Sequence, residues 1–118
     1  MNSQLPAWFE FKWRNLIVTL KLLKMDKLDQ NTIQSRLEKL EGWEYKDNAI
    51  HTSLEFENFK EAFSMMTRIA FEAELQQHHP DWTNVYNTLN ISLSTHDAGG
   101  VTEKDFKLAH AIEKLIDA

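Results

Sequence analysis

The fold is decided by residues 78–96, HHPDWTNVYNTLNISLSTH, where apolar and polar side chains begin to alternate. A period of two is typical of a strand with one buried face. The stretch predicts two strands, over residues 83–86 and 89–95, joined in a hairpin that turns near Asn87-Thr88. The residues expected on its apolar face are Val85, Leu89, Ile91 and Leu93.

Before this stretch the apolar residues recur with the period of a helix. Asn58, followed three residues later by Glu61, has the spacing of a helix N-terminus, in which the first side chain caps the first turn. A long helix is therefore predicted from this point to the His-His-Pro sequence, and its apolar stripe is expected to pack in the core. The stripe consists of Phe59, Ala62, Phe63, Met66, Ile69, Ala70 and Ala73.

The first part of the chain predicts one more helix and two short strands. Asp29 or Asn31 can cap that helix, and Gly42 stands where a helix C-cap is expected. The strands are predicted over residues 43–45 and 50–56, on either side of the turn residues Lys46, Asp47 and Asn48. The apolar residues of the helix are Ile33, Leu37 and Leu40.

After the stretch, residues 97–100 (DAGG) break the sheet, and Thr102 opens a last helix with Asp105 in its first turn. The buried face of this helix is expected to hold Leu108, Ala109, Ile112, Leu115 and Ile116. The order α-β-β-α-β-β-α predicts an α+β fold. We expect a two-layer sandwich, with helices on one face of a four-stranded antiparallel sheet, over residues 25–118.

The composition excludes several classes of function. A chain of 118 residues has the length of one domain. Its net charge of −5 argues against nucleic acid, because proteins that bind it usually carry a basic face. It contains no cysteine, which excludes disulfides, thiolate metal ligands and a cysteine nucleophile. This composition fits a reducing compartment, and we expect a cytoplasmic protein.

Residues 1–24 differ from the remainder in charge. They carry a net charge of +3, which leaves −8 for residues 25–118. Charged residues interrupt the segment too often for a bilayer span or a secretory signal, and no membrane is expected as a partner. A basic amphipathic anchor stays open. We favour the alternative that Met25 is the true start and that residues 1–24 are an upstream translation or an unstructured extension.

Three of the five histidines, His78, His79 and His96, lie within the same stretch. An imidazole with its unperturbed pKa of about 6.5 gives or takes a proton near neutral pH, so the three predict proton-transfer chemistry. A metal site completed by Asp97 or Asp105 is the alternative. It is disfavoured because adjacent histidines rarely aim both rings at one ion, and we expect no metal.

The order of these residues resembles the pterin-4a-carbinolamine dehydratase family. The shared pattern is an acid, three residues, His-His-Pro, a strand rich in Trp and Tyr, a third His, and an Asp that opens the last helix. The resemblance extends from about Leu28 to Leu115 and leaves out residues 1–24. Ala98 stands where some members carry a cysteine, a change that we expect to be tolerated. The matching residues are Glu74, His78-His79-Pro80, Asp81-Trp82, residues 84–87, residues 92–96 and Asp105.

This resemblance implies a hydro-lyase without a bound cofactor. Its reaction is the dehydration of 4a-hydroxytetrahydropterin (4a-hydroxytetrahydrobiopterin) to quinonoid dihydropterin, which recycles the cofactor of aromatic amino acid hydroxylases. His78 and His79 are expected as the acid/base centre, with His96 assisting from the opposite wall and Asp105 orienting or charging a histidine. The residues expected to bind the pterin are Glu74, His78, His79, Pro80, Thr95, His96, Asp97 and Ala98.

Two questions about partners follow from the same pattern. An open sheet in a small domain exposes edge strands, which pairing across a two-fold axis would cover, and the resemblance points to a homodimer or homotetramer. Animal members of the family also act as a dimerisation cofactor for a homeodomain transcription factor. A non-enzymatic, protein-binding scaffold of the same fold is therefore the alternative function, and the intact histidines with Asp105 favour the enzyme.

Overall fold

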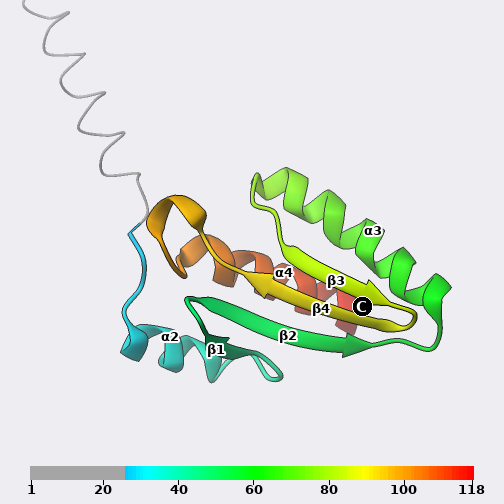
Figure 1. The fold of residues 1–118 in the computed structure, drawn as a ribbon, viewed down its shortest axis with the longest axis horizontal. Helices are drawn as coiled ribbons and strands as arrows, with labels where there is room; N and C mark the ends of the chain where they lie inside the picture. The colour runs from blue at the N-terminus through cyan, green and yellow to red at the C-terminus, as the bar shows by residue number, and fades with distance from the viewer. Residues whose placement is uncertain (1–25) are drawn as a thin grey trace, which may run out of the picture.

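The computed structural model describes residues 26–118, so the expectations for residues 1–24 lie outside the described part of the chain. Helices and strands follow the predicted order α-β-β-α-β-β-α, with a 3₁₀ turn before the last helix (Figure 1). The elements are α2 (Gln30–Leu37), β1 (Glu44–Lys46), β2 (Ala49–Glu55), α3 (Phe59–Gln76), β3 (Asp81–Val85), β4 (Thr88–Leu93), the turn η1 (His96–Ala98) and α4 (Glu103–Asp117).

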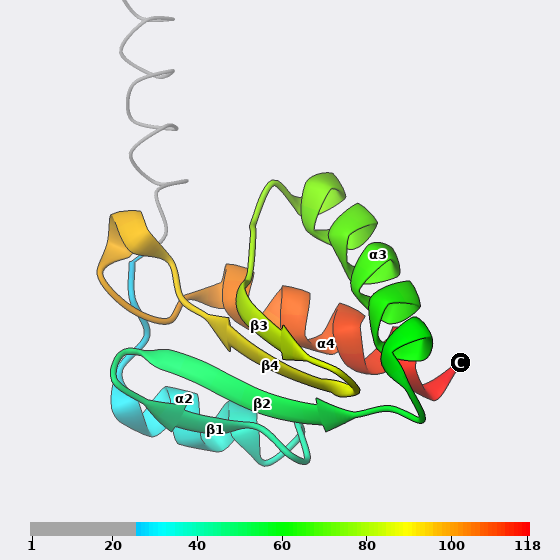
Figure 2. The same cartoon turned by 45° about the vertical axis from the view of Figure 1, so that its right-hand side comes forward.

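The four strands form one antiparallel sheet in the order β1-β2-β4-β3, so β1 and β3 are its edges. Ile50 lies opposite Leu93, and Thr52 lies opposite Ile91, which places all four on one face. These four side chains are buried. α4 runs behind β3 and β4 in both views, and α3 packs against α4 (Figures 1 and 2). The α+β fold predicted from the sequence is thus confirmed.

The boundaries of the strands differ from the predicted ones by one or two residues, and in one place the difference moves a side chain to the other face. The second hairpin turns at Tyr86-Asn87, one residue earlier than predicted, with Tyr86 at a φ of 51°. Val85 therefore lies opposite Thr88 on the outer face and is 74% exposed. A register shift of one residue exchanges the two faces of a strand, so the predicted inward position of Val85 was wrong.

The predicted C-cap of the first helix was also wrong. α2 ends at Leu37, its C-cap is Glu38, and the chain continues in turns in which the Leu40 N–H bonds the Leu37 carbonyl. Gly42, at a φ of 87°, lies in the turn that leads into β1. Its left-handed backbone suits glycine there, five residues beyond the end of the helix. The N-cap is Asp29, one of the two residues proposed for it.

The apolar stripe predicted on α3 is buried only in part. Ala62, Ile69 and Ala73 are buried, whereas Phe59 and Phe63 are 50% and 57% exposed. The helix meets the rest of the domain mainly along its contact with α4, and the outer part of the stripe is left about half exposed. Ala70 is exposed as well, and Met66 is half-buried. No helix between Asp26 and Ala118 has both the length and the apolar character needed to cross a bilayer.

The face assignment on the hairpin predicts two different effects of shortening a side chain. Ile91→Ala removes a fully buried side chain and should lower the free energy of unfolding by about 2–5 kcal/mol. Val85→Ala should change it by less than about 0.5 kcal/mol, because the side chain lies on the outer face. Urea unfolding followed by circular dichroism measures both. A loss for Val85→Ala as large as that for Ile91→Ala would contradict the observed register.

Candidate active site

The end of α3 fixes the backbone of His78. Gln77 adopts a left-handed conformation, with φ 50° and ψ 43°, and its N–H bonds the carbonyls of Ala73 and Glu74. The His78 N–H bonds the Ala73 carbonyl at 3.0 Å. These bonds close the helix in a Schellman motif, in which glycine is the usual left-handed residue. Because the motif sets the direction in which the chain leaves α3, it also sets the place of the first histidine.

The first turn of α4 fixes the carboxylate of Asp105. The Thr102 side chain caps the helix by accepting from the Lys104 N–H at 3.2 Å, and the Asp105 Oδ2 accepts from the Thr102 N–H at 2.8 Å. This is the capping box that the sequence predicts. Asp105 is nevertheless fully buried, at 0% exposure, which a carboxylate with only a capping role would not require.

His78 and Asp105 meet although 27 residues separate them in the chain. The His78 Nε2 lies 2.5 Å from the Asp105 Oδ1, and their side chains are 10% and 0% exposed. The other oxygen of the carboxylate, Oδ2, accepts from the Thr95 hydroxyl at 2.9 Å. The Thr95 and Thr102 hydroxyls are 2.7 Å apart. Since Thr95 donates to the carboxylate, Thr102 must donate to Thr95.

This network assigns the protons on the His78 ring. An ionised carboxylate only accepts hydrogen bonds, so Nε2 carries the hydrogen that is shared with Asp105. In the neutral imidazole Nδ1 is then the nitrogen with a free lone pair. No hydrogen bond within residues 26–118 engages Nδ1. The His78 ring is thereby held in one orientation, with one nitrogen free of hydrogen bonds to the described residues.

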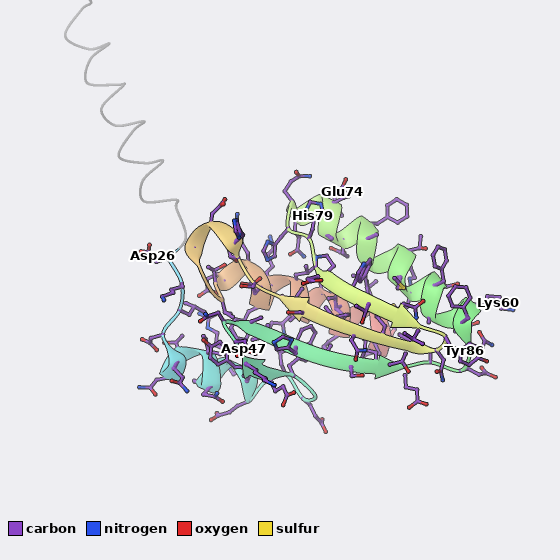
Figure 3. The ribbon with its side chains drawn as sticks, viewed as in Figure 1. Asp26, Asp47, Lys60, Glu74, His79 and Tyr86 are labelled. Carbon is purple, nitrogen blue, oxygen red and sulfur yellow. The ribbon has the colours of Figure 1, made fainter. Side chains whose placement is uncertain are left out.

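His79 forms a second pair with a carboxylate. Its Nε2 lies 2.6 Å from the Glu74 Oε2, and the two side chains are 62% and 68% exposed. Figure 3 shows Glu74 and His79 side by side at the C-terminal end of α3. Pro80 follows directly and restricts His79 to an extended backbone, so the chain enters β3 without a further turn. The two adjacent histidines therefore have different environments, one buried and one facing water.

The loop that carries the third histidine is tied to the same network. Thr95 donates its N–H to the Gly100 carbonyl at 2.9 Å and is 9% exposed, so its polar groups are engaged inside the protein. His96 and Asp97, in η1, are exposed, and Ala98 is half-buried. Within the described residues no hydrogen bond joins the His96 ring to the other two histidines. Its part in the site stays a prediction.

The structure thus brings together His78, Thr95 and Asp105 in one network, and Glu74 and His79 in a second pair. Thr102 belongs to the first network, and the sequence reading missed this role. The capping sequence identified Thr102, but only the fold brings its hydroxyl to Thr95. Among residues 26–118 no group of three or more His, Cys, Asp or Glu side chains could hold a metal ion.

A larger hollow on the described surface lies away from these residues. It measures about 900 Å³ and lies over the outer face of the sheet, around His51. None of the residues expected in the site lines it. His78 instead lines a smaller cavity, of about 290 Å³, between the end of α3 and the start of α4.

Known proteins are similar to this chain in sequence and in fold. The model of the family described as "Pterin 4 alpha carbinolamine dehydratase" matches residues 26–115. A protein of Christiangramia forsetii named "Putative pterin-4-alpha-carbinolamine dehydratase" is 66% identical over 94 residues, which are 80% of this chain and 97% of that protein. A protein of Prochlorococcus marinus with the same name is 45% identical over 91 residues, 77% of this chain and 96% of that one.

A solved structure agrees with these sequence matches. It is the crystal structure of a "transcriptional coactivator/pterin dehydratase" from Brucella melitensis, which is 37% identical to this chain. The two superpose with a TM-score of 0.74, over 76% of this chain and 98% of that one. The likeness therefore covers nearly the whole length of the solved protein.

The two carboxylate–histidine pairs should differ in their effect on stability. Asp105→Ala leaves buried donors without an acceptor and should lower the free energy of unfolding by about 3–5 kcal/mol. Glu74→Ala breaks an exposed pair and should lower it by less than about 1 kcal/mol. Urea unfolding at neutral pH measures both. Equal losses for the two variants would show that burial does not distinguish the pairs.

Proposed function

The chain belongs to the pterin 4 alpha carbinolamine dehydratase family, and we propose that it dehydrates a 4a-hydroxytetrahydropterin with His78 and His79 as its acid and base. By homology it is a hydro-lyase. The observation that carries the proposed mechanism is the 2.5 Å contact between His78 and the buried Asp105. It holds one imidazole in a fixed orientation, and the next residue along the chain carries a second imidazole.

The reaction needs two proton transfers and no change of oxidation state overall. The N5 lone pair of the pterin forms the N5=C4a double bond as the C4a–O bond breaks. N5 gives up its proton to a base, and the departing hydroxide takes a proton from an acid and leaves as water. General acid and base groups in such steps contribute typically about 10²–10⁴-fold to the rate.

The two carboxylate–histidine pairs suit a reaction that needs one acid and one base. In our proposal one imidazole accepts the N5 proton while the other, as imidazolium, protonates the hydroxyl group. Asp105 and Glu74 each contact an Nε2, which supports Nδ1 of both rings as the nitrogen that faces the substrate. We assign His96 an assisting role from η1, and we assign the shaping of the pterin pocket to four further residues. These are Pro80, Thr95, Asp97 and Ala98.

We further propose that the substrate comes from aromatic amino acid hydroxylases and that the product is recycled by a reductase. The cytoplasm is the compartment that we propose for both steps. The alternative, a non-catalytic scaffold of the same fold, gives no physical reason for burying Asp105 against His78. Burying a carboxylate is unfavourable unless it is paired, so the intact network favours the enzyme.

An assembly of several copies is supported by apolar surface on α3. Four large side chains, spaced four or eight residues apart along the helix, are between 50% and 80% exposed. Residues at this spacing form one ridge on a helix, and ridges of this kind pack against one another between helices. We propose that this ridge packs against a second copy of the chain and that the edge strand β3 pairs across a two-fold axis. The ridge consists of Phe59, Phe63, Phe71 and Leu75.

Substitution of the histidines tests the mechanism. His78→Ala and His79→Ala should each lower the rate of dehydration by at least about tenfold, because each removes a group that moves a proton in the transition state. Stopped-flow absorbance with 4a-hydroxytetrahydropterin measures the rate, and circular dichroism checks the fold. His51→Ala, on the outer face of β2, is the matched control. If His51→Ala slows the reaction as much, the assignment of the site is wrong.

Sedimentation tests the assembly. At micromolar concentration the protein should sediment as a dimer or tetramer, and Phe63→Asp with Leu75→Asp should give a smaller species, since charge on the ridge opposes its burial. Lys60→Asp, which also places an aspartate on an exposed part of α3, is the control and should leave the assembly unchanged. A native chain that sediments as a stable monomer would overturn the proposal.

A further inference from the structure

The cavity beside His78 is lined by groups that donate hydrogen bonds. It measures about 290 Å³ and opens between the end of α3 and the first turns of α4. Two ammonium groups and one amide surround it, together with one carboxylate and the His78 ring. The lining residues are Gln76, His78, Glu103, Lys104 and Lys107.

The one carboxylate of the cavity is engaged outside it. Both oxygens of Glu103 contact the guanidinium of Arg36, one to each terminal nitrogen. The guanidinium also lies over the ring of Phe106, with its central carbon 5.8 Å from the ring centroid. Such two-pronged pairs are strong and directional. The negative charge of Glu103 is therefore compensated from α2 and is not available to the lysines.

The two lysines have no carboxylate partner in the described part of the chain. Among residues 26–118 neither Lys104 nor Lys107 has a salt-bridge partner, and the side-chain amide of Gln76 has no hydrogen bond. Both lysines lie in the first turns of α4, where the partial charge of the helix is positive. In a chain with a net charge of −5, this is a positively charged corner next to the proposed catalytic histidine.

We propose that Lys104 and Lys107 bind an anionic substituent, a phosphate or a carboxylate, on the side chain of the pterin substrate. The inference rests on the proposed function, because it names the substrate class of that same site. Because His78 itself lines the cavity, a pterin ring bound at this histidine would, in this proposal, extend its side chain into it. There the two ammonium groups and the Gln76 amide meet the anion, whereas a side chain that ends in neutral hydroxyl groups gains no ion pair.

Binding of three stable, oxidised pterins to the full chain tests this. They are 6-hydroxymethylpterin, its phosphate ester and pterin-6-carboxylate, and calorimetry gives the Kd of each. At low salt at least one anionic pterin should bind about tenfold tighter than the neutral one. Lys104→Gln with Lys107→Gln should bring this ratio close to one, and about 0.5 M salt should reduce it. Lys114→Gln, at the other end of α4, is the matched control and should keep the ratio.

Each outcome either supports or rejects the proposed anion site. A preference for the phosphate ester alone, or for the carboxylate alone, identifies the anion. Equal affinities for the three pterins, a ratio that survives the double substitution, or no binding of any pterin overturns the lysine site. Turnover of a neutral 4a-hydroxytetrahydropterin separates the two proposals. If the neutral pterin turns over and no anionic pterin is preferred, only the lysine site is rejected. If an anionic pterin is preferred but no substrate turns over, only the dehydratase activity is rejected.

Discussion

The buried carboxylate of Asp105 is the group on which the rest of the site depends. Its two oxygens accept from the Thr102 N–H, the Thr95 hydroxyl and the His78 ring, at 2.5–2.9 Å. These donors come from the start of α4, the end of the sheet and the end of α3. A carboxylate at 0% exposure is stable only if its oxygens are paired. The need to satisfy it therefore ties three separate segments together at one point.

That constraint explains why two neighbouring histidines have different surroundings. His78 takes its position from the left-handed Gln77 and reaches inward, whereas His79 is directed outward and pairs with Glu74 in water. An acid and a base that act in one reaction must differ in protonation at the same pH. A buried pair and an exposed pair supply two different environments within one dipeptide.

Much of the fold could be predicted from the sequence because the spacing of the apolar residues indicates which face of each helix or strand is buried. The alternation at Ile91 and Leu93 gave β4, and the helical stripes gave α3 and α4. Val85 was misplaced because its face depends on the turn, and Tyr86 is not a residue that normally marks a left-handed turn position. Phe59 and Phe63 of the α3 stripe were misplaced for a related reason, since a helical period does not say which neighbour covers the apolar face.

The site residues stay a prediction, and the sequence could not say how they would be connected. The motif named His78, His79 and Asp105, but spacing alone could not say which histidine the carboxylate would meet, because adjacent residues differ only in the direction that the backbone gives them. The role of Thr102 in the hydrogen-bond network could not be predicted for a similar reason. Its hydroxyl joins the network through Thr95, a contact that the closing of the loop at Gly100 creates.

The central claim is that Asp105 holds His78 with a hydrogen on Nε2 and leaves Nδ1 for the substrate. Nitrogen NMR of ¹⁵N-labelled protein tests it directly, since protonated and unprotonated ring nitrogens have distinct shifts. At a pH where the ring is neutral, the account predicts that Nε2 of His78 carries the hydrogen and that Nδ1 does not. In Asp105→Asn this preference should weaken or reverse, because the amide can also donate. A native ring with its hydrogen on Nδ1 would contradict the account.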